Sequence, residues 1–232
     1  MKQIIIMPTY NEAENIKKII PILFNQMDIS ILVVDDNSPD GTANIVEEYQ
    51  KKYSNLYLLK REQKDGLASA YIAGFKYALD KNYQVLAQMD SDFQHPYEVL
   101  PEMLKKLEQE NADILIGSRY VQNGKWEKGS LKKEIISKLG NIYSRIVLNS
   151  KVNDLTGGYN IWTKKALLEI GLDNIIAKGY MFQIEMKFLA EKNNLKIIEY
   201  PIKFSPRIEG QSKMDFKICI EALTKIWKLR KK

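Results

Sequence analysis

The organisation of the chain is clearest in the stretch Ala87-Gln88-Met89-Asp90-Ser91-Asp92-Phe93-Gln94-His95-Pro96. The run 85–89 predicts a buried strand, and the proline introduces a helix that we expect over 97–107. The polar residues between them therefore lie where a strand ends and a helix begins. In α/β folds, ligands usually bind at this edge of the sheet.

Three side chains of this stretch, Asp90, Asp92 and Gln94, present oxygen atoms at alternate positions. Such an oxygen-only set suits a hard divalent cation that is shared with substrate phosphates. The stretch alone also fits an Asp-rich turn that caps the following helix, because short D-x-D strings are common. A metal site and a structural turn are both open at this point.

The first half of the chain alternates short apolar strands with helices. We expect strands over 2–7, 29–34, 56–59, 85–89 and 113–117, and helices over 13–26, 43–53, 66–79 and 97–107. The run 29–34 is apolar without interruption, as in strands that are covered on both faces. This alternation predicts an α/β fold with a mostly parallel, helix-covered sheet.

The second half is less regular. We expect a mobile polar loop over 121–130, helices over 131–148, 164–170 and 180–191, and one long strand over 196–204. A turn that begins at Asp154 leads into a further strand. One domain accommodates all of these elements, because 232 residues with 45% hydrophobic content can bury a large core.

Cysteine usage and hydropathy indicate the compartment. Cys219 is the only cysteine, which excludes a disulfide framework and a thiolate metal cluster and fits a reducing compartment. No run of about 18 apolar residues occurs, and the N-terminus leads directly into a strand. We therefore expect a cytoplasmic protein.

Most of the net charge of +6 lies near the C-terminus, where Lys213 to Lys232 contain seven Lys or Arg and two acids. A helix predicted over 214–229 places its lysines on one face. Its other face carries Phe216, Cys219, Ile220, Leu223, Ile226 and Trp227. This helix could lie on an anionic membrane, each cation contributing about 1 kcal/mol, or pack on the core with a solvated lysine face. Nucleic acid is not an expected partner, because the basic residues do not cover the domain.

Acidic residues also follow the first two predicted strands. Glu12 follows one strand, and Asp35 and Asp36 follow the next. Carboxylates at these positions can accept hydrogen bonds from a nucleotide base or a ribose hydroxyl. The sequence has no G-x-x-x-x-G-K-[ST] loop and no G-x-G-x-x-G after a strand, so a metal ion would have to hold the nucleotide phosphates.

Several ordered motifs together resemble the family 2 glycosyltransferases, and within them the dolichol-phosphate (polyprenyl-phosphate) mannose synthases. They are Pro8–Glu12, Val33–Thr42, Gly66–Tyr71, Met89–Pro96, Gly117–Tyr120, Asp154–Tyr159, Gly179–Glu185 and Arg207–Lys213. The resemblance spans nearly the whole chain, and motifs in a fixed order are far more specific than any one of them.

The resemblance implies a GT-A fold in a single domain over 1–232. A nucleotide-sugar-binding half would cover 1–119, an acceptor-binding half 120–213 and a basic amphipathic helix 214–232. The implied reaction is an inverting, metal-dependent transfer of mannose from GDP-mannose to a polyisoprenyl phosphate. Such an enzyme would be peripheral to the cytoplasmic face of a membrane.

The resemblance also implies roles for residues at the motif positions. Pro8, Tyr10, Glu12, Val34 and Asp36 would hold the nucleoside. Asp90, Asp92 and Gln94 would hold Mg²⁺ or Mn²⁺ on the diphosphate, with Ser91 beside them, and Arg119, Arg207 and Lys213 would engage phosphates. Asp92 and Arg119 would be the catalytic residues.

The sequence shows no obvious general base. An alcohol acceptor needs one, whereas a phosphate monoester, with a second pKa of about 6, is already ionised at neutral pH. The only histidine, His95, precedes a proline at a helix start, where a turn or capping role is expected. Lys133 stands where the related enzymes have an arginine, and lysine keeps the charge without the bidentate geometry.

Two alternatives remain open. The donor could be UDP-glucose or another nucleotide sugar, and the acceptor a polyprenyl phosphate or a saccharide hydroxyl, because glucosyl-transferring relatives share most of these motifs. From a different functional class, the chain could be a nucleotide-sugar-binding module without turnover.

Overall fold

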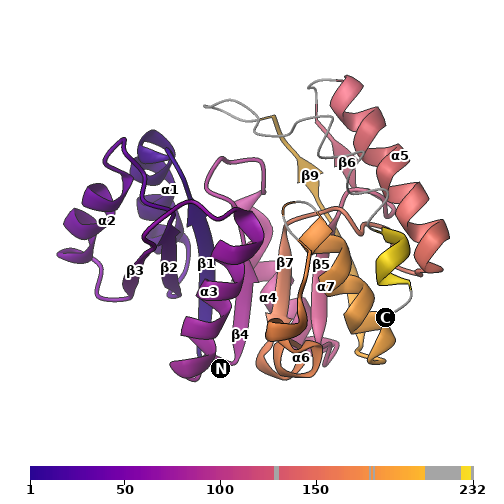
Figure 1. Cartoon of the computed structure of the whole chain (residues 1–232). Helices are drawn as coiled ribbons and strands as arrows, with labels where there is room; N and C mark the ends of the chain where they lie inside the picture. The colour runs from indigo at the N-terminus through magenta and orange to yellow at the C-terminus, as the bar shows by residue number, and fades with distance from the viewer. Residues whose placement is uncertain (128–130, 178, 180, 207–225, 231–232) are drawn as a thin grey trace.

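The structure is a computed structural model that describes residues 1–127, 131–177, 179, 181–206 and 226–230, without the side chains of residues 132 and 133 (Figure 1). Arg207, Lys213, Cys219 and most of the predicted C-terminal helix lie outside the described residues, as does the side chain of Lys133. The described turn 226–229 is helical and buries Ile226. Trp227, expected on the same face, is 50% exposed.

A central sheet crosses the molecule (Figure 1). Within the described residues it has seven strands in the order β3-β2-β1-β4-β7-β5-β8. Their bounds are β1 Gln3–Thr9, β2 Ser30–Asp35, β3 Leu56–Lys60, β4 Val85–Gln88, β5 Ile114–Ser118, β7 Asn160–Thr163 and β8 Ile197–Pro201. β7 is antiparallel to both neighbours, and the other pairings are parallel. The predicted α/β fold with a mostly parallel sheet is confirmed.

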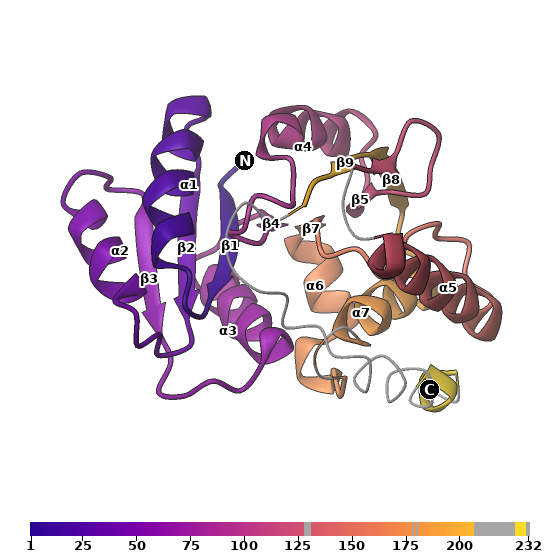
Figure 2. The ribbon, with the colours of Figure 1, turned by 90° about the horizontal axis from the view of Figure 1, so that it is seen from above.

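Helices cover both faces of this sheet, and α5 Leu131–Leu148 lies at its β8 end (Figures 1 and 2). They are α1 Ala13–Gln26, α2 Thr42–Gln50, α3 Leu67–Asp80, α4 Leu100–Gln109, α5 Leu131–Leu148, α6 Lys164–Ile170 and α7 Met181–Lys192, with 3-10 turns at Tyr97–Val99 and Leu172–Asn174. Figure 2 shows α1 and α4 on one face and α3, α6 and α7 on the other. Ile4 and Ile6 of β1 pack on the α3 side, whereas Ile5 and Met7 pack on the α1 side. This strict alternation buries both faces of the strand.

Several predicted bounds are confirmed, and two predictions are wrong. Helices 13–26, 131–148 and 164–170 have the expected limits. The strand expected over 196–204 is divided into β8 and β9 Lys203–Phe204. The segment expected to be loop over 121–130 contains β6 Lys125–Trp126, which pairs with β9. Tertiary pairing explains both differences. Between β8 and β9 the backbone N–H of Ile202 donates to the carbonyl of Ser118, and here the chain leaves the central sheet and enters the small sheet of β6 and β9.

The sheet reverses its direction of growth at β1. From β1 the chain adds β2 and then β3 on one side, while β4 pairs with the other side of β1. The carboxyl ends of β1, β2 and β4 consequently lie side by side. A crevice at such a reversal is the usual ligand site of an open α/β sheet. No helix within the described ranges is both long enough and apolar enough to span a bilayer.

Candidate active site

Asp90 lies two positions after the end of β4 and is held by a buried tyrosine. The hydroxyl of Tyr71 on α3 donates to Asp90 Oδ1 over 2.7 Å. Burial, and then the negative charge of Asp90, raise the pKa of Tyr71 well above its ordinary value, so Tyr71 remains a donor at neutral pH. The sheet and α3 therefore fix this carboxylate together.

Asp92 is buried and belongs to a tight turn. Its Oδ1 accepts the backbone N–H of Gln94 at 3.2 Å, and the intervening Phe93 has a positive φ of 61°. The side-chain amide of Gln94 donates to the carbonyl of Ser205 at 3.2 Å, so this turn is also tied to the segment after β9. Ser91 is buried beside the two carboxylates.

The side chain of His95 supports the same turn. Its Nδ1 accepts the backbone N–H of Asp90 at 3.0 Å, and its ring stacks on Tyr159 with centroids 4.9 Å apart. Because Nδ1 accepts a hydrogen bond from a backbone N–H, it carries no proton while this hydrogen bond is made. The expected turn role of His95 is confirmed.

The carboxylates after β2 have structural partners. Asp35 accepts from Thr9 Oγ1 at 2.8 Å and from the Ser38 hydroxyl at 2.6 Å. Asp36 forms a 2.7 Å ion pair with Arg61. Burial raises the pKa of Asp36 despite the opposing charge of Arg61. The contact with Thr9 holds the end of β2 against β1, and the pair with Arg61 holds it against the end of β3.

The other residues predicted to hold the nucleoside lie around the same strand ends. Pro8 and Val34 are partners in the register of β1 and β2. The ammonium of Lys64 lies over the ring of Tyr10, with Nζ 3.9 Å from the ring centroid. Glu12 accepts from the side chain of Asn15 over 2.7 Å. The structure thus brings all five predicted nucleoside residues to one edge of the sheet.

Arg119, after β5, makes a buried bidentate pair. Its Nε and Nη2 each donate to Asp154 at 2.8 Å, and Nη2 also donates to Thr156 Oγ1 at 2.9 Å. Burial would raise the pKa of Asp154, but the charge and hydrogen bonds of Arg119 outweigh it and lower the pKa to about 2. Within the described part of the chain, no hydrogen bond uses Nη1 of Arg119.

Aromatic rings surround the same guanidinium. Its carbon lies 4.8 Å from the ring centroid of Trp126, 5.2 Å from that of Tyr120 and 5.3 Å from that of Phe204. Trp126 and Phe204 belong to the small β6–β9 sheet, and their rings meet edge to face. The small sheet therefore serves as an aromatic wall that orients Arg119.

A buried lysine fixes the turn that carries Asp154. Lys187 of α7 donates to the carbonyls of Asp154 at 2.9 Å and Gly157 at 2.7 Å. Burial lowers the pKa of Lys187 to about 8, although Asp154 acts in the opposite direction. Glu199 of β8 accepts the backbone N–H of Asp154 over 3.0 Å.

The donor set after β4 fits a divalent cation that is shared with a ligand. Among the described residues, no three His, Cys, Asp or Glu side chains are close enough to hold a metal by themselves. Asp90 and Asp92 offer carboxylate oxygens beyond the carboxyl end of β4, each oriented by a specific donor. One or two carboxylates completed by phosphate oxygens is the usual way in which proteins bind Mg²⁺.

Sequence reasoning missed the partners of these residues. Tyr71 and Asp154 were noted as members of the motifs Gly66–Tyr71 and Asp154–Tyr159, and Asp154 also as the start of a turn, without a role for either side chain. Lys187 lay inside a predicted helix without any assigned role. One signal was available for Lys187, since polar Gln183, Glu185 and Lys187 alternate with apolar residues in this helix, which leaves no purely polar face for the lysine.

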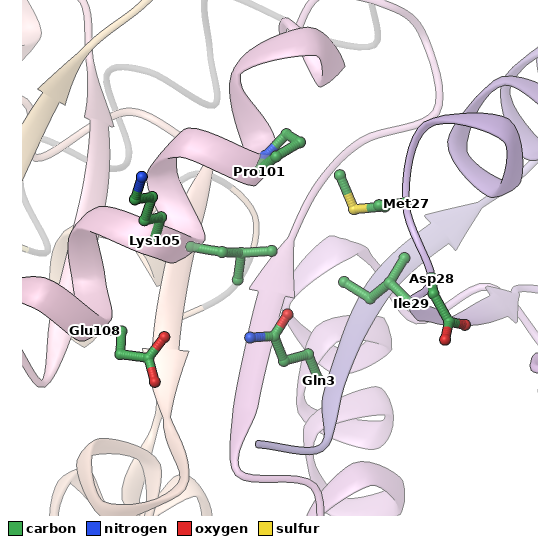
Figure 3. Close-up of a pocket in the computed structure, with 8 residues that line it drawn as sticks. Gln3, Met27, Asp28, Ile29, Pro101, Lys105 and Glu108 are labelled. Atoms are coloured by element: carbon green, nitrogen blue, oxygen red, sulfur yellow. The ribbon is translucent and has the colours of Figure 1, made fainter.

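A shallow depression of about 260 Å³ lies away from this edge of the sheet (Figure 3). Gln3, at the start of β1, contributes to its wall together with Met27, Ile29 and Lys105. Residues at the amino end of β1 lie at the opposite edge of the sheet from the carboxylates, which follow the carboxyl ends of the strands. The depression therefore has no part in the candidate site.

Comparisons with known protein families and sequences agree with one another. A family model described as Glycosyl transferase family 2 matches residues 4–171. The chain is 39% identical over 227 residues to an undecaprenyl-phosphate mannosyltransferase of Micrococcus luteus, covering 97% of this chain and 93% of that protein. It is 37% identical over 233 residues to a polyprenol monophosphomannose synthase of Mycolicibacterium smegmatis, covering 99% and 88%.

Solved structures share the fold at low sequence identity. Glucosyl-3-phosphoglycerate synthase from Mycobacterium tuberculosis superposes with a TM-score of 0.72 at 16% identity, over 99% of this chain and 80% of that one. A mannosyltransferase from Pyrobaculum calidifontis, in complex with GDP-Man and Mn²⁺, superposes with a TM-score of 0.61 at 16% identity, over 91% and 58%.

Proposed function

The chain belongs to glycosyltransferase family 2 and is a glycosyltransferase with a GT-A-type fold, and from this premise we propose that it transfers mannose from GDP-mannose to a polyprenyl phosphate. The observation that carries the proposal is the near full-length similarity to two enzymes whose names specify mannose and polyprenyl phosphate. The proposed location is the cytoplasmic face of a membrane, where a polyprenyl lipid presents its phosphate.

The donor nucleotide is proposed to lie across the carboxyl ends of β1 and β2. Pro8, Tyr10, Glu12, Val34 and Asp36 would surround the nucleoside. The diphosphate would then reach the end of β4, beside Asp90 and Asp92. This placement agrees with the reversal of strand order between β1 and β4.

Asp90 and Asp92, with Gln94, would hold Mg²⁺ or Mn²⁺. Such an ion, when bound, offsets the negative charge that develops on the departing diphosphate. The tyrosine donor on Asp90 and the backbone donor on Asp92 keep the carboxylates in place before the ligand arrives. A solved structure of the same fold contains Mn²⁺ together with GDP-Man, which supports a divalent ion.

The transfer itself is proposed as a single displacement with inversion. An oxygen of the acceptor phosphate forms a bond to the anomeric carbon while the bond from that carbon to the donor diphosphate breaks. The bonding electron pair leaves with the nucleoside diphosphate, and an already ionised acceptor gives up no proton. Accordingly, His95 is engaged in holding the turn rather than placed as a base. Arg119 would engage phosphate through Nη1, and Arg207 and Lys213 remain proposed phosphate contacts.

Asp92→Asn tests the metal assignment. We expect turnover with Mn²⁺ to fall roughly 100-fold or more, since one group that stabilises developing charge is lost. The measurement is release of GDP from GDP-mannose in the presence of polyprenyl phosphate, together with Mn²⁺ binding followed by electron paramagnetic resonance. Asp173→Asn, at an 83% exposed carboxylate, is the matched control. Wild-type Mn²⁺ binding by Asp92→Asn would refute the assignment.

A donor and acceptor screen separates the alternatives. GDP-mannose and UDP-glucose are each incubated with polyprenyl phosphate or with a saccharide, and the released nucleoside diphosphate is measured. We expect release with GDP-mannose and polyprenyl phosphate only. Release of UDP alone would change the donor, release with a saccharide alone would defeat the lipid acceptor, and no release would favour a binding module.

A further inference from the structure

Helix α5 exposes an apolar stripe. Its members are Leu131, Ile135, Leu139, Ile142 and Ile146, with exposed fractions of 74%, 56%, 61%, 42% and 73%. Successive helical residues are about 100° apart, so the five positions fall within an arc of about 80° and extend over about 22 Å. Large aliphatic side chains gathered in this way on a surface mark an interaction site.

The face of α5 that meets the protein combines buried polar residues with apolar residues at its C-terminal end, where Val147 and Leu148 join the core. Asn141 and Ser144 are buried, and Asn141 bonds with the backbone of Asn153 and Leu155. Ser137 accepts a hydrogen bond from the hydroxyl of Tyr120 at 3.2 Å. Both polar groups and apolar side chains attach this helix to the domain, and a separate apolar stripe on its other face points outward.

We infer that the stripe on α5 seats the protein on the surface of an anionic lipid bilayer. The helix is too polar to cross a bilayer, as no described helix meets that requirement. A helix with one apolar face lies instead in the interface, with that face among the acyl chains. The inference rests on the proposed lipid acceptor and identifies the surface through which it is reached.

Cations and a tryptophan lie at the borders of the stripe. Lys138 is exposed on α5 itself. Trp227 donates its indole N–H to the hydroxyl of Tyr143 on α5 at 2.9 Å and is 50% exposed. Arg230 is exposed and lies 5.6 Å from the Trp227 ring. Tryptophan and basic side chains beside an apolar face are the composition that suits an anionic membrane interface.

The position of α5 connects this surface with the reaction. Asn141 holds both sides of the turn that carries Asp154, and Asp154 holds Arg119. A bilayer under α5 would therefore be separated by α5 and by the turn of Asp154 from the guanidinium that is proposed to meet phosphate. In both views α5 is at the β8 end of the sheet, outside α7, with the C-terminal turn 226–230 beside it (Figures 1 and 2).

A second copy of the chain fits the stripe less well. A stable protein interface usually takes about 20–30 residues from each partner, whereas the stripe offers five aliphatic side chains with charged neighbours. A membrane needs no shape complementarity, so one helical face is sufficient.

The test compares Ile135→Gln/Leu139→Gln with wild type in sedimentation with vesicles of phosphatidylcholine and phosphatidylglycerol. We expect at least tenfold weaker vesicle binding by the variant. Leu168→Gln/Ile176→Gln is the matched control, because these side chains are 60% and 62% exposed but lie away from α5. Circular dichroism confirms folding, and Leu131→Gln/Ile146→Gln is a second variant of the stripe.

Transfer assays separate this inference from the proposed function. With a short, water-soluble prenyl phosphate, the stripe variant should transfer mannose at the wild-type rate, while transfer to long-chain polyprenyl phosphate in vesicles should fall. Wild-type vesicle binding by both stripe variants overturns the inference, even if wild type is an active mannosyltransferase. If wild type binds vesicles, the stripe variants do not, and wild type transfers no mannose, the inference stands and the proposed function is wrong. A dimer that the stripe variant dissociates identifies a second copy as the occupant and overturns the inference.

Discussion

Asp154 shows at the residue scale how one buried carboxylate stabilises both the fold and the site. Its pKa is lowered to about 2 from 3.8, so its stabilising contribution is present above about pH 4 and is lost as pH falls through 2. The size of this contribution is roughly 2 kcal/mol, and removing the charge from a buried pair costs about 3–5 kcal/mol. We expect Asp154→Asn to lower the free energy of unfolding, measured in urea, by less at pH 3 than at pH 7. Thr156→Val, which leaves the ion pair intact, is the control, and an equal loss at both pH values would contradict the assignment.

Two helical glycines make a matched pair at the scale of the element. A Cβ on Gly74 of α3 would lie 2.4 Å from Ile6 Cγ2 and 3.0 Å from Val34 Cγ2, because α3 packs closely on β1 and β2. Gly140 of α5 has no atom within 4 Å of the same position. Gly74→Ala should therefore destabilise the protein by about 1–3 kcal/mol, whereas Gly140→Ala should stabilise it by about 0.5–1 kcal/mol. Urea unfolding measures both. A neutral effect at Gly74 would mean that α3 can shift away from the sheet.

At the scale of the whole molecule, the site is assembled from strands that are far apart in the sequence, so ligand binding should be linked to global unfolding. With GDP and Mn²⁺ at about 100 times their dissociation constant, the free energy of unfolding should rise by about 2.7 kcal/mol. For a chain of this size, the melting temperature should rise by roughly 5–10 °C. Differential scanning calorimetry measures the shift, and a chelator should abolish it. The same shift by GDP in the presence of chelator would show that the nucleotide needs no metal.

Local patterns in the sequence determined the class of fold and the position of the candidate site. The apolar run of β2 and the helical periodicity of α3 predict their elements because both signals depend on neighbouring residues. Polar residues at the ends of β1, β2 and β4 indicate one edge of a parallel sheet. The order of the motifs then indicated the family, which the family model and the relatives confirm.

Tertiary structure alone decided which partners these residues have. Arg119 is separated from Asp154 by 35 positions, and Tyr71 from Asp90 by 19, and no local period links such pairs. The long strand expected over 196–204 is divided because its two ends pair with different sheets. The apolar stripe of α5 has a helical period that sequence can reveal, but its direction depends on which face the protein covers. That choice follows from the burial of Val147 and Leu148 and from hydrogen bonds of Asn141 to residues 12 and 14 positions away.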